Sequence, residues 1–433
     1  MEALVRRPRV PSFRLPLVAA SLAAVVAASG CAISSDGGGG GGGDGDKTVL
    51  TFWSYYVGAQ KTWLDGRVAA FEKANPDIDV QVVETVGDQQ DQRLLASVAT
   101  KTTPDLFINN IVVDFPTLVA GGVTADLTPY WEKYADAGQW PEQAAWKNDG
   151  KVYNLLPFTN LLGMYYNKDV LAESGITEPP KTLDELQEDL ATVKAGGKYE
   201  GLALSGAPTV EGAWLFAPQL LGEQVDYCTW ADSGPKVSAA FDRLGSWTSA
   251  GYIPQAAATW DQNDSWQQFV TGRYAFAFNG NWQLGNGGDA AFQWGTAQYP
   301  APTGGSSVVY PGGEGFGIGE TSKNKDLAWK FLQEAILSPE AGEQIFTTAG
   351  SIPVRSDAAQ SSAIQDDANA LPFATAAQST GQWPNNPETA TAQTALGTAV
   401  SSVISGQATP ADAAASATDG IAKALAEGGG TCR

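Results

Sequence analysis

From Thr48 onward, the chain alternates between short runs with strand character and longer stretches with helical spacing of apolar residues. The runs with strand character are 49–53, 78–82 and 105–108, and the helical stretches between them are 64–71 and 94–98. Strands that alternate with helices favour a parallel sheet, because a crossover helix is the usual connection between parallel neighbours. The pattern therefore predicts an α/β fold.

The same style continues after residue 160. Residues 161–166 read as a buried strand, and Thr182 with Glu185 forms a capping box that begins a helix ending at Gly197. Tyr274, Phe276 and Phe278 alternate before an expected turn at Asn279-Gly280, and Pro339 opens a late helix. The alanine-rich segments 356–370 and 388–427 are expected to be surface helices.

Composition limits the function. The 433 residues include 26 basic and 47 acidic side chains, no histidine and three cysteines. The formal charge of −21 argues against nucleic-acid binding, which depends on Lys and Arg. Without histidine, a Ser-His-Asp triad and a histidine-ligated zinc site are excluded, and we expect neither a metal nor a cofactor. The length suggests two domains, with three as the alternative.

The first thirty residues have the pattern of a secretory signal. Four arginines precede a 14-residue apolar or small run, residues 15–28, which is short for a membrane span. The run ends in Ala28-Ser29-Gly30-Cys31, which resembles a bacterial lipoprotein box with Cys31 as the lipidated first residue. An ordinary signal peptide cut near Ala28, with Cys31 as a spare thiol, is the alternative.

A tether follows this signal. Residues 31–47 contain seven consecutive glycines, Gly37 to Gly43, and cannot form a core. Its reach of roughly 20–24 Å would hold a folded body close to a membrane. Outside the cell disulfides are allowed, and we expect Cys228 and Cys432 to pair, with two free thiols as the alternative.

Motifs in a defined order along the body resemble one family. They are 51–54 (TFWS), 71–76 (FEKANP), 104–107 (PDLF), 162–169 (LGMYYNKD), 272–276 (GRYAF) with 279–282 (NGNW), 312–318 (GGEGFGI), 328–332 (AWKFL) and 350–355 (GSIPVR). This order is similar to that of extracellular solute-binding proteins of carbohydrate ABC importers, the group that includes maltose-binding protein. The resemblance covers nearly all of residues 48–360.

The resemblance implies a periplasmic-binding-protein-like fold of type II. Its two lobes would each hold a mainly parallel sheet flanked by helices, and the chain would cross between them near 157–163, near 310–315 and between 350 and 372. The expected ranges are 48–158 with 314–355 for the N-lobe and 159–313 with 356–433 for the C-lobe. Ligand would bind between the lobes, where strands end.

Residue types that suit a sugar stand at these expected strand ends. Aromatic faces pack against the C–H faces of sugar rings, while carboxylates and amides bind hydroxyls. The ligand-binding candidates are Trp53, Tyr55, Asn109, Asn110, Asn160, Glu211, Trp214, Trp260, Asp261, Trp282, Glu314 and Trp383.

Structural alternatives stay open for several of these candidates. Trp53 could be a core tryptophan at a strand end, and Asn109-Asn110 could serve a turn. Glu211 could complement a helix dipole, and Trp260 could be a surface anchor. Other tryptophans are expected to be structural: Trp63 and Trp329 in a core, and Trp131, Trp140 and Trp146 packed together.

The sequence therefore predicts a lipid-anchored, monomeric binding protein on the outer face of the cell membrane. It would deliver a mono- or oligosaccharide to the transmembrane subunits of an ABC permease. A sensory or adhesive lipoprotein with the same cleft is the alternative. A glycoside hydrolase is disfavoured, because no specific pair of carboxylates stands out and no motif of nucleophilic or phosphate chemistry occurs.

Overall fold

The computed structural model describes residues 47–429 and residue 432 of the chain. The predicted signal peptide, Cys31 and the tether up to residue 46 lie outside these residues. Among the helices of the described part, none is long and apolar enough to cross a bilayer.

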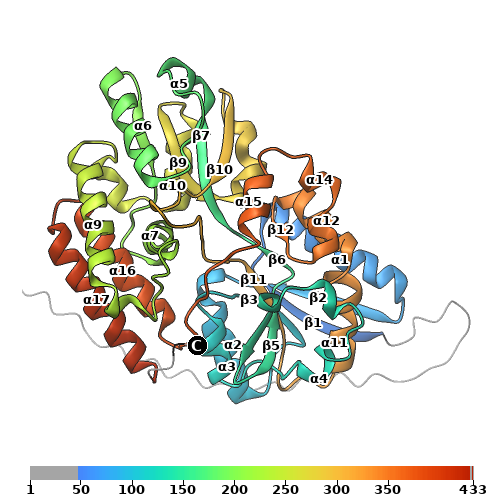
Figure 1. Ribbon diagram of the computed structural model, residues 1–433. Coiled ribbons are helices and arrows are strands. Elements are labelled where there is room, and N and C mark those ends of the chain that lie inside the picture. Colours follow the sequence, from blue (N-terminus) through green and yellow to red (C-terminus); the bar gives the residue numbers. More distant parts are fainter. Residues whose placement is uncertain (1–46, 430–431, 433) are drawn as a thin grey trace, which may run out of the picture. The chain divides into compact units, whose positions relative to one another are not determined.

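The first lobe is built on a six-stranded sheet with the order β2-β1-β3-β11-β5-β4 (Figure 1). Its strands are β1 (Thr48–Ser54), β2 (Ile78–Glu84), β3 (Leu106–Asn110), β4 (Ala145–Asn148), β5 (Lys151–Leu155) and β11 (Glu314–Ile318). β1 pairs in parallel with β2 and β3, whereas β11 runs antiparallel to both β3 and β5. The strands expected from the apolar runs near 49, 78 and 105 are confirmed.

The second lobe is built on a four-stranded sheet with the order β10-β7-β9-β8. Its strands are β7 (Leu162–Asn167), β8 (Glu200–Ala203), β9 (Tyr274–Gly280) and β10 (Trp294–Gln298). Only β8 and β9 are parallel. Both sheets are thus mixed, and the expected mainly parallel sheets are wrong in this respect. In the first sheet, β11 enters after an excursion through the second lobe and returns in the opposite direction.

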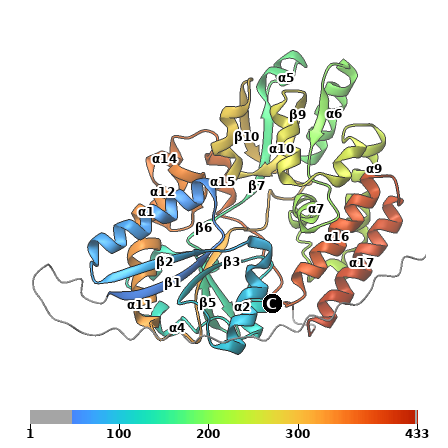
Figure 2. The same cartoon turned by 180° about the vertical axis from the view of Figure 1, so that it is seen from behind.

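Three chain segments meet between the two sheets. β6 (Phe158–Thr159) pairs with β12 (Ile352–Pro353), and Asn160 forms an antiparallel bridge with Gly312. β6 lies between the two sheets in both Figure 1 and Figure 2. These segments coincide with the three expected crossings, while the exact division of the chain between lobes stays a prediction.

Helices flank both sheets. In the first half of the chain they are α1 (Gly58–Ala74), α2 (Gly87–Thr100), α3 (Phe115–Ala120), α4 (Thr128–Trp131), α5 (Lys168–Glu173), α6 (Leu183–Gly196), α7 (Val210–Phe216) and α8 (Pro218–Leu221). They continue with α9 (Gly234–Ser249), α10 (Gln262–Val270), α11 (Lys325–Phe331), α12 (Pro339–Ala349), α13 (Ser356–Ala359), α14 (Ser362–Gln365), α15 (Leu371–Ala376), α16 (Thr389–Ile404) and α17 (Pro410–Glu427).

The expected helix ends are confirmed where local chemistry dictates them. Thr182 and Glu185 form the reciprocal capping box of α6, and Gly197 ends that helix in the left-handed conformation with φ of 68°. Pro339 stands at the start of α12, with the Ser338 hydroxyl accepting a hydrogen bond from the Ala341 amide.

Two expectations about packing are wrong. α16 is not a surface helix: it lies against α7, α9 and α17, so that Leu396, Val400 and Ile404 are buried in the core of the second lobe (Figure 2). Likewise Trp131 contacts Trp140, with 6.2 Å between ring centroids, but Trp146 packs against Phe115 instead. Helical spacing alone does not reveal a helix that is covered on several sides.

Two tertiary links hold the later parts of the chain. Arg355 is 4% exposed, and its guanidinium donates hydrogen bonds to Asp136, Asp357 and the Leu337 carbonyl, which ties the third crossing to the first lobe. The Cys228–Cys432 disulfide joins the C-terminal end to the loop before α9. The expected pairing of these cysteines is present in the structure.

Candidate functional site

A cavity of about 190 Å³ lies where the two sheets and the crossings meet. Its lining combines ends of β3, β7 and β11 with α7, α10 and the segments near 282, 310 and 383. The lining residues are Asn110, Val112, Asn160, Leu162, Trp214, Gln262, Trp282, Tyr310, Gly312, Gly313, Glu314 and Trp383. Six predicted binding residues are among them: Asn110, Asn160, Trp214, Trp282, Glu314 and Trp383. We call this cavity the aromatic cleft.

The ring of Trp282 owes its place to the end of β9. Gly280 is the last residue of that strand, and a Cβ atom at this position would overlap the Trp282 ring. A glycine is thus required for the ring to lie across the strand end. Asn279-Gly280 is expected from the sequence to form a turn; instead both residues belong to β9, because they continue its antiparallel pairing with Gly163 and Leu162 of β7.

Two further rings form a stacked wall. Tyr310 and Trp383 lie with 3.8 Å between ring centroids and 19° between planes. The Trp383 indole N–H donates to the Pro311 carbonyl at 2.7 Å, and the Trp214 indole N–H donates to Gln393 at 2.6 Å. With their N–H groups engaged, these side chains present mainly ring surface to the cleft.

Glu314 and Asn110 supply the polar edge. They are direct partners in the antiparallel pairing of β11 with β3, so both side chains stand at the same edge of the first sheet. Burial raises the pKa of the Glu314 carboxyl from its ordinary 4.5 to about 7, against the opposing effect of a backbone hydrogen bond. Close by, burial and then the charge of Asp91 raise the pKa of Asp114 to about 7.

Two buried polar atoms of the cleft residues have no hydrogen-bond partner among the described residues. They are Oε2 of Glu314, an acceptor when ionised and a donor when protonated, and Nε2 of Gln262, a donor. An unpartnered buried polar group costs free energy, and such groups in a native structure call for a functional explanation.

The other predicted residues of the first lobe do not line this cleft. Trp53 lies under the Arg93 guanidinium, 4.2 Å from the ring centroid, and packs against a small core cluster that includes Leu94 and Phe107. Asn109 is fully buried and accepts a hydrogen bond from the Asn154 amide, a structural role within the sheet. Tyr55 is packed against the core, where burial, then the charges of Glu314 and Asp114, raise the pKa of its hydroxyl.

Three predicted residues of the second lobe also stand outside the cleft lining. Glu211 lies in the first turn of α7, and its carboxylate accepts a hydrogen bond from the backbone N–H of Gln262 at 2.7 Å. Asp261 is the N-cap of α10, and Trp260 packs edge-to-face on Tyr274 with centroids 6.2 Å apart. Glu211 and Asp261 thus both lie at helix N-termini, the position that the structural alternative for Glu211 describes.

Comparisons with known proteins identify the family. Residues 66–375, more than half of the chain, match the family described as bacterial extracellular solute-binding protein. The chain belongs to this family. By its description the family is extracellular, and the relatives reported below are binding proteins.

Relatives of known ligand come from several organisms. The diacetylchitobiose-binding protein of Streptomyces coelicolor is 27% identical over 87% of this chain and 90% of its own length. The maltotriose-binding protein of Pyrococcus abyssi is 27% identical over 54% of this chain and 51% of its own.

Solved structures share the two-lobe architecture. The cyclic α-maltosyl-1,6-maltose-binding protein of Arthrobacter globiformis has a TM-score of 0.74 and is 25% identical in sequence. The match covers 88% of this chain and 100% of that chain. The GacH receptor of Streptomyces glaucescens, solved free and with acarbose, has a TM-score of 0.75 at 23% identity, covering 88% and 99%. At that identity the second likeness concerns the fold alone.

Several residues that line the aromatic cleft were not predicted from the sequence. Gln262 and Tyr310 were not among the candidates, although Tyr310 directly precedes Pro311-Gly312-Gly313 at an expected crossing. Val112 and Leu162 contribute apolar surface and resemble any other buried apolar residue in the sequence. Only the neighbouring glycine motif could have drawn attention to Tyr310.

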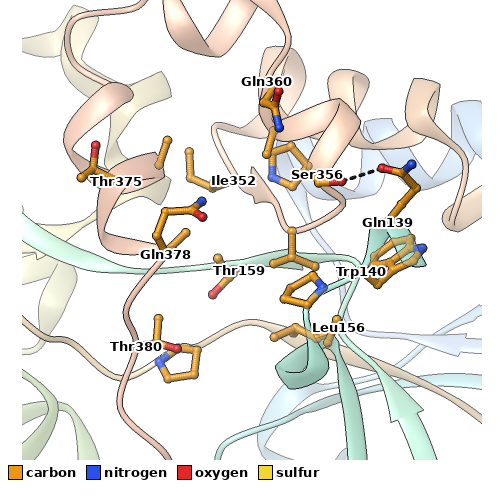
Figure 3. Close-up of a pocket in the computed structure, with 18 of the residues that line it drawn as sticks. Gln139, Trp140, Leu156, Thr159, Ile352, Ser356, Gln360, Thr375, Gln378 and Thr380 are labelled. Atoms are coloured by element: carbon orange, nitrogen blue, oxygen red, sulfur yellow. Dashed lines mark hydrogen bonds between the residues drawn. The ribbon is translucent and has the colours of Figure 1, made fainter. Parts of the chain in front are cut away.

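A larger cavity of about 600 Å³ lies on other surfaces of the crossings. Figure 3 shows Gln139, Gln360, Gln378, Thr375 and Thr380 around it. Its floor includes Leu156, Thr159 and Ile352, and its one aromatic lining residue is Trp140. It contains none of the predicted binding residues and lacks the opposed rings of the aromatic cleft, so the aromatic cleft is the candidate site.

Proposed function

We propose that this protein is the extracytoplasmic substrate-binding component of an ABC importer and captures a sugar or oligosaccharide in the aromatic cleft. The proposal extends to lipid anchoring through Cys31 and to delivery of the sugar to transmembrane permease subunits. Family membership supports the binding role, and the relatives bind diacetylchitobiose and maltotriose.

One observation carries the sugar assignment: four aromatic side chains and two residues with an unpartnered buried polar atom line one small cavity. Rings suit the C–H faces of a sugar, and the unpartnered groups of Glu314 and Gln262 suit its hydroxyls. The cleft lining includes no Lys or Arg, which disfavours a phosphorylated sugar. We propose no catalytic activity, because the lining holds a single carboxyl group and glycoside hydrolysis needs two.

Closure of the lobes provides the mechanism. Ligand that contacts both lobes binds the closed arrangement more tightly and shifts the population toward it. The rings come from the second lobe and the crossings, while Asn110 and Glu314 come from the first sheet, so a sugar between them has partners on both sides. The permease would recognise the closed form.

A thermal-shift screen tests the proposal. The mature protein is heated with maltotriose, diacetylchitobiose, glucose, mannobiose and, as a charged control, glucose 6-phosphate. A ligand that binds only the native state raises the melting temperature, and we expect at least one neutral saccharide to do so in a concentration-dependent way. Equal melting curves with all saccharides, or a shift with the phosphate alone, would contradict the sugar assignment.

A further inference from the structure

The segment between α15 and α16 crosses the edge of the aromatic cleft. Residues 380–388, which we call the strap, contain no helix or strand. The strap begins with a parallel bridge from Thr380 to Val309 and a hydrogen bond from the Gly381 amide to the Val309 carbonyl at 2.9 Å. Three residues later it places Trp383 in the cleft lining.

Contacts from both lobes hold the strap. On the first-lobe side, the Asn385 amide donates to Asn148 of β4 at 3.2 Å, and Thr117 of α3 donates to the Pro387 carbonyl at 3.3 Å. On the second-lobe side, the Asn386 amide donates to the Leu425 carbonyl of α17 at 2.9 Å. A loop without its own secondary structure thus depends on these neighbours for its position.

The disulfide reaches the strap by two routes. The backbone amide of Asn385 donates to the carbonyl of Cys432 at 3.4 Å, so one half-cystine touches the strap directly. The other half, Cys228, follows Tyr227, whose ring lies 6.0 Å from that of Trp383 and 5.9 Å from that of Tyr310. Tyr227 is 2% exposed and its ring backs the stacked wall.

We propose that the Cys228–Cys432 disulfide and Tyr227 are positioning elements for Trp383, and that they raise the saccharide affinity of the cleft by fixing its aromatic wall. This inference rests on the proposed function. The physical reason is preorganisation: a ring that is already held in place loses less conformational freedom when a sugar packs against it. A purely structural disulfide would instead act on the unfolded chain and change stability alone.

Two variants remove the proposed support. C228S/C432S breaks the covalent link, while α17 keeps its buried contacts through Ala413, Ala417 and Ile421. Y227L removes the backing ring without touching the disulfide. The matched controls are Y227F, which keeps the ring and removes a hydroxyl that has no partner in the described residues, and A417G, which weakens α17 away from the strap.

The first readout needs no ligand. Near-ultraviolet circular dichroism reports the fixed stacking of Trp383 on Tyr310, and W383L defines the part of the spectrum that this stack contributes. We expect C228S/C432S and Y227L to lose that part, with far-ultraviolet spectra unchanged, and Y227F and A417G to keep it. Because the disulfide and Tyr227 absorb in this region themselves, only the part of the spectrum that W383L removes is compared. Retention of that part in both C228S/C432S and Y227L would overturn the inference.

The second readout is calorimetric titration with maltotriose and diacetylchitobiose. We expect C228S/C432S and Y227L to bind about 3- to 10-fold more weakly than wild type. Y227F and A417G should stay within about twofold, since neither moves the wall. Unchanged affinity in the two support variants would overturn the inference even if their spectra change. If neither probe binds the wild type, the titration uses the saccharide that stabilised the protein in the thermal-shift screen. If no saccharide did so, the sugar assignment is at fault, and the spectra alone decide the positioning role.

Discussion

The two lobes contribute different chemistry to the aromatic cleft. The first sheet supplies Asn110 and Glu314, which face each other across paired strands and carry hydrogen-bonding groups. The second lobe supplies Trp214, Gln262 and Trp282, and so presents mainly rings. Substitutions in one lobe should therefore remove ring contacts, and substitutions in the other lobe should remove hydrogen bonds, each without the other. If the lobes close on the ligand as proposed, open lobes leave the rings able to hold a sugar face, and the acidic edge engages fully only on closure.

The largest expected effect comes from the second lobe. Trp282→Ala removes a ring that lines the cleft and should weaken saccharide binding by about 1–3 kcal/mol, because a buried aromatic contact is lost. Calorimetric titration with the saccharide found in the thermal-shift screen measures this change. Trp260→Ala is the control, since it removes an equal ring from the same lobe outside the cleft lining. Equal saccharide affinities of wild type and Trp282→Ala would show that the Trp282 ring does not contact the saccharide.

The next effect belongs to the first lobe and depends on pH. Because burial raises the folded-state pKa of Glu314 from 4.5 to about 7, the folded protein binds more protons than the unfolded chain between these values. The contribution of Glu314 to stability is therefore greatest below about pH 4.5 and is lost as the pH rises through about 7. The whole change is up to about 3 kcal/mol, of which about 2 kcal/mol falls between pH 5 and 7.5.

Glu314→Gln should remove this contribution to the dependence of the free energy of unfolding on pH. Urea unfolding of the ligand-free proteins at pH 5, 6 and 7.5 measures it. Asp114, whose pKa is also raised to about 7, contributes to both proteins, so the difference between them isolates Glu314. If the free energies of unfolding of wild type and Glu314→Gln change in parallel with pH, Glu314 is solvated in the folded protein. The proposed role of its carboxyl in a buried binding site would then be contradicted.

A smaller effect separates stability from binding within the second lobe. Thr182→Ala removes the capping box of α6 and should lower the free energy of unfolding by about 1 kcal/mol. Saccharide affinity should not change, since α6 contributes nothing to the cleft lining. Thr192→Ala, an exposed position on the same helix, is the matched control. A loss of affinity in Thr182→Ala would mean that the second lobe is less rigid than its packing implies.

The smallest expected effect concerns Trp53, the predicted binding residue of the first lobe whose ring lies under Arg93. Trp53→Phe keeps an aromatic ring beside Arg93 and should leave saccharide affinity within about 0.5 kcal/mol of wild type. Titration under the conditions used for Trp282→Ala provides the comparison. A marked loss of affinity would show that the first lobe also offers a ring, and the division between the lobes would then be less strict.

Much of this protein could be predicted from the sequence where local chemistry decides. The capping box at Thr182, the glycine stop at Gly197 and the apolar strands near 49, 78 and 105 depend on neighbours in the chain, and they were predicted correctly. The family motifs in order led to the two-lobe fold. Six candidates in the cleft lining were found because their residue types and places at strand ends or crossings suit sugar binding.

The remaining features depend on packing between residues far apart in the chain. The burial of α16 follows from its place between other helices, and the stack of Tyr310 on Trp383 joins positions that no local pattern relates. Trp53 and Trp282 both stand at strand ends, yet Arg93 covers one ring while the other lines the cleft. Residue type determines which contacts a side chain favours; only the tertiary structure decides whether a neighbouring part of the chain already occupies that surface.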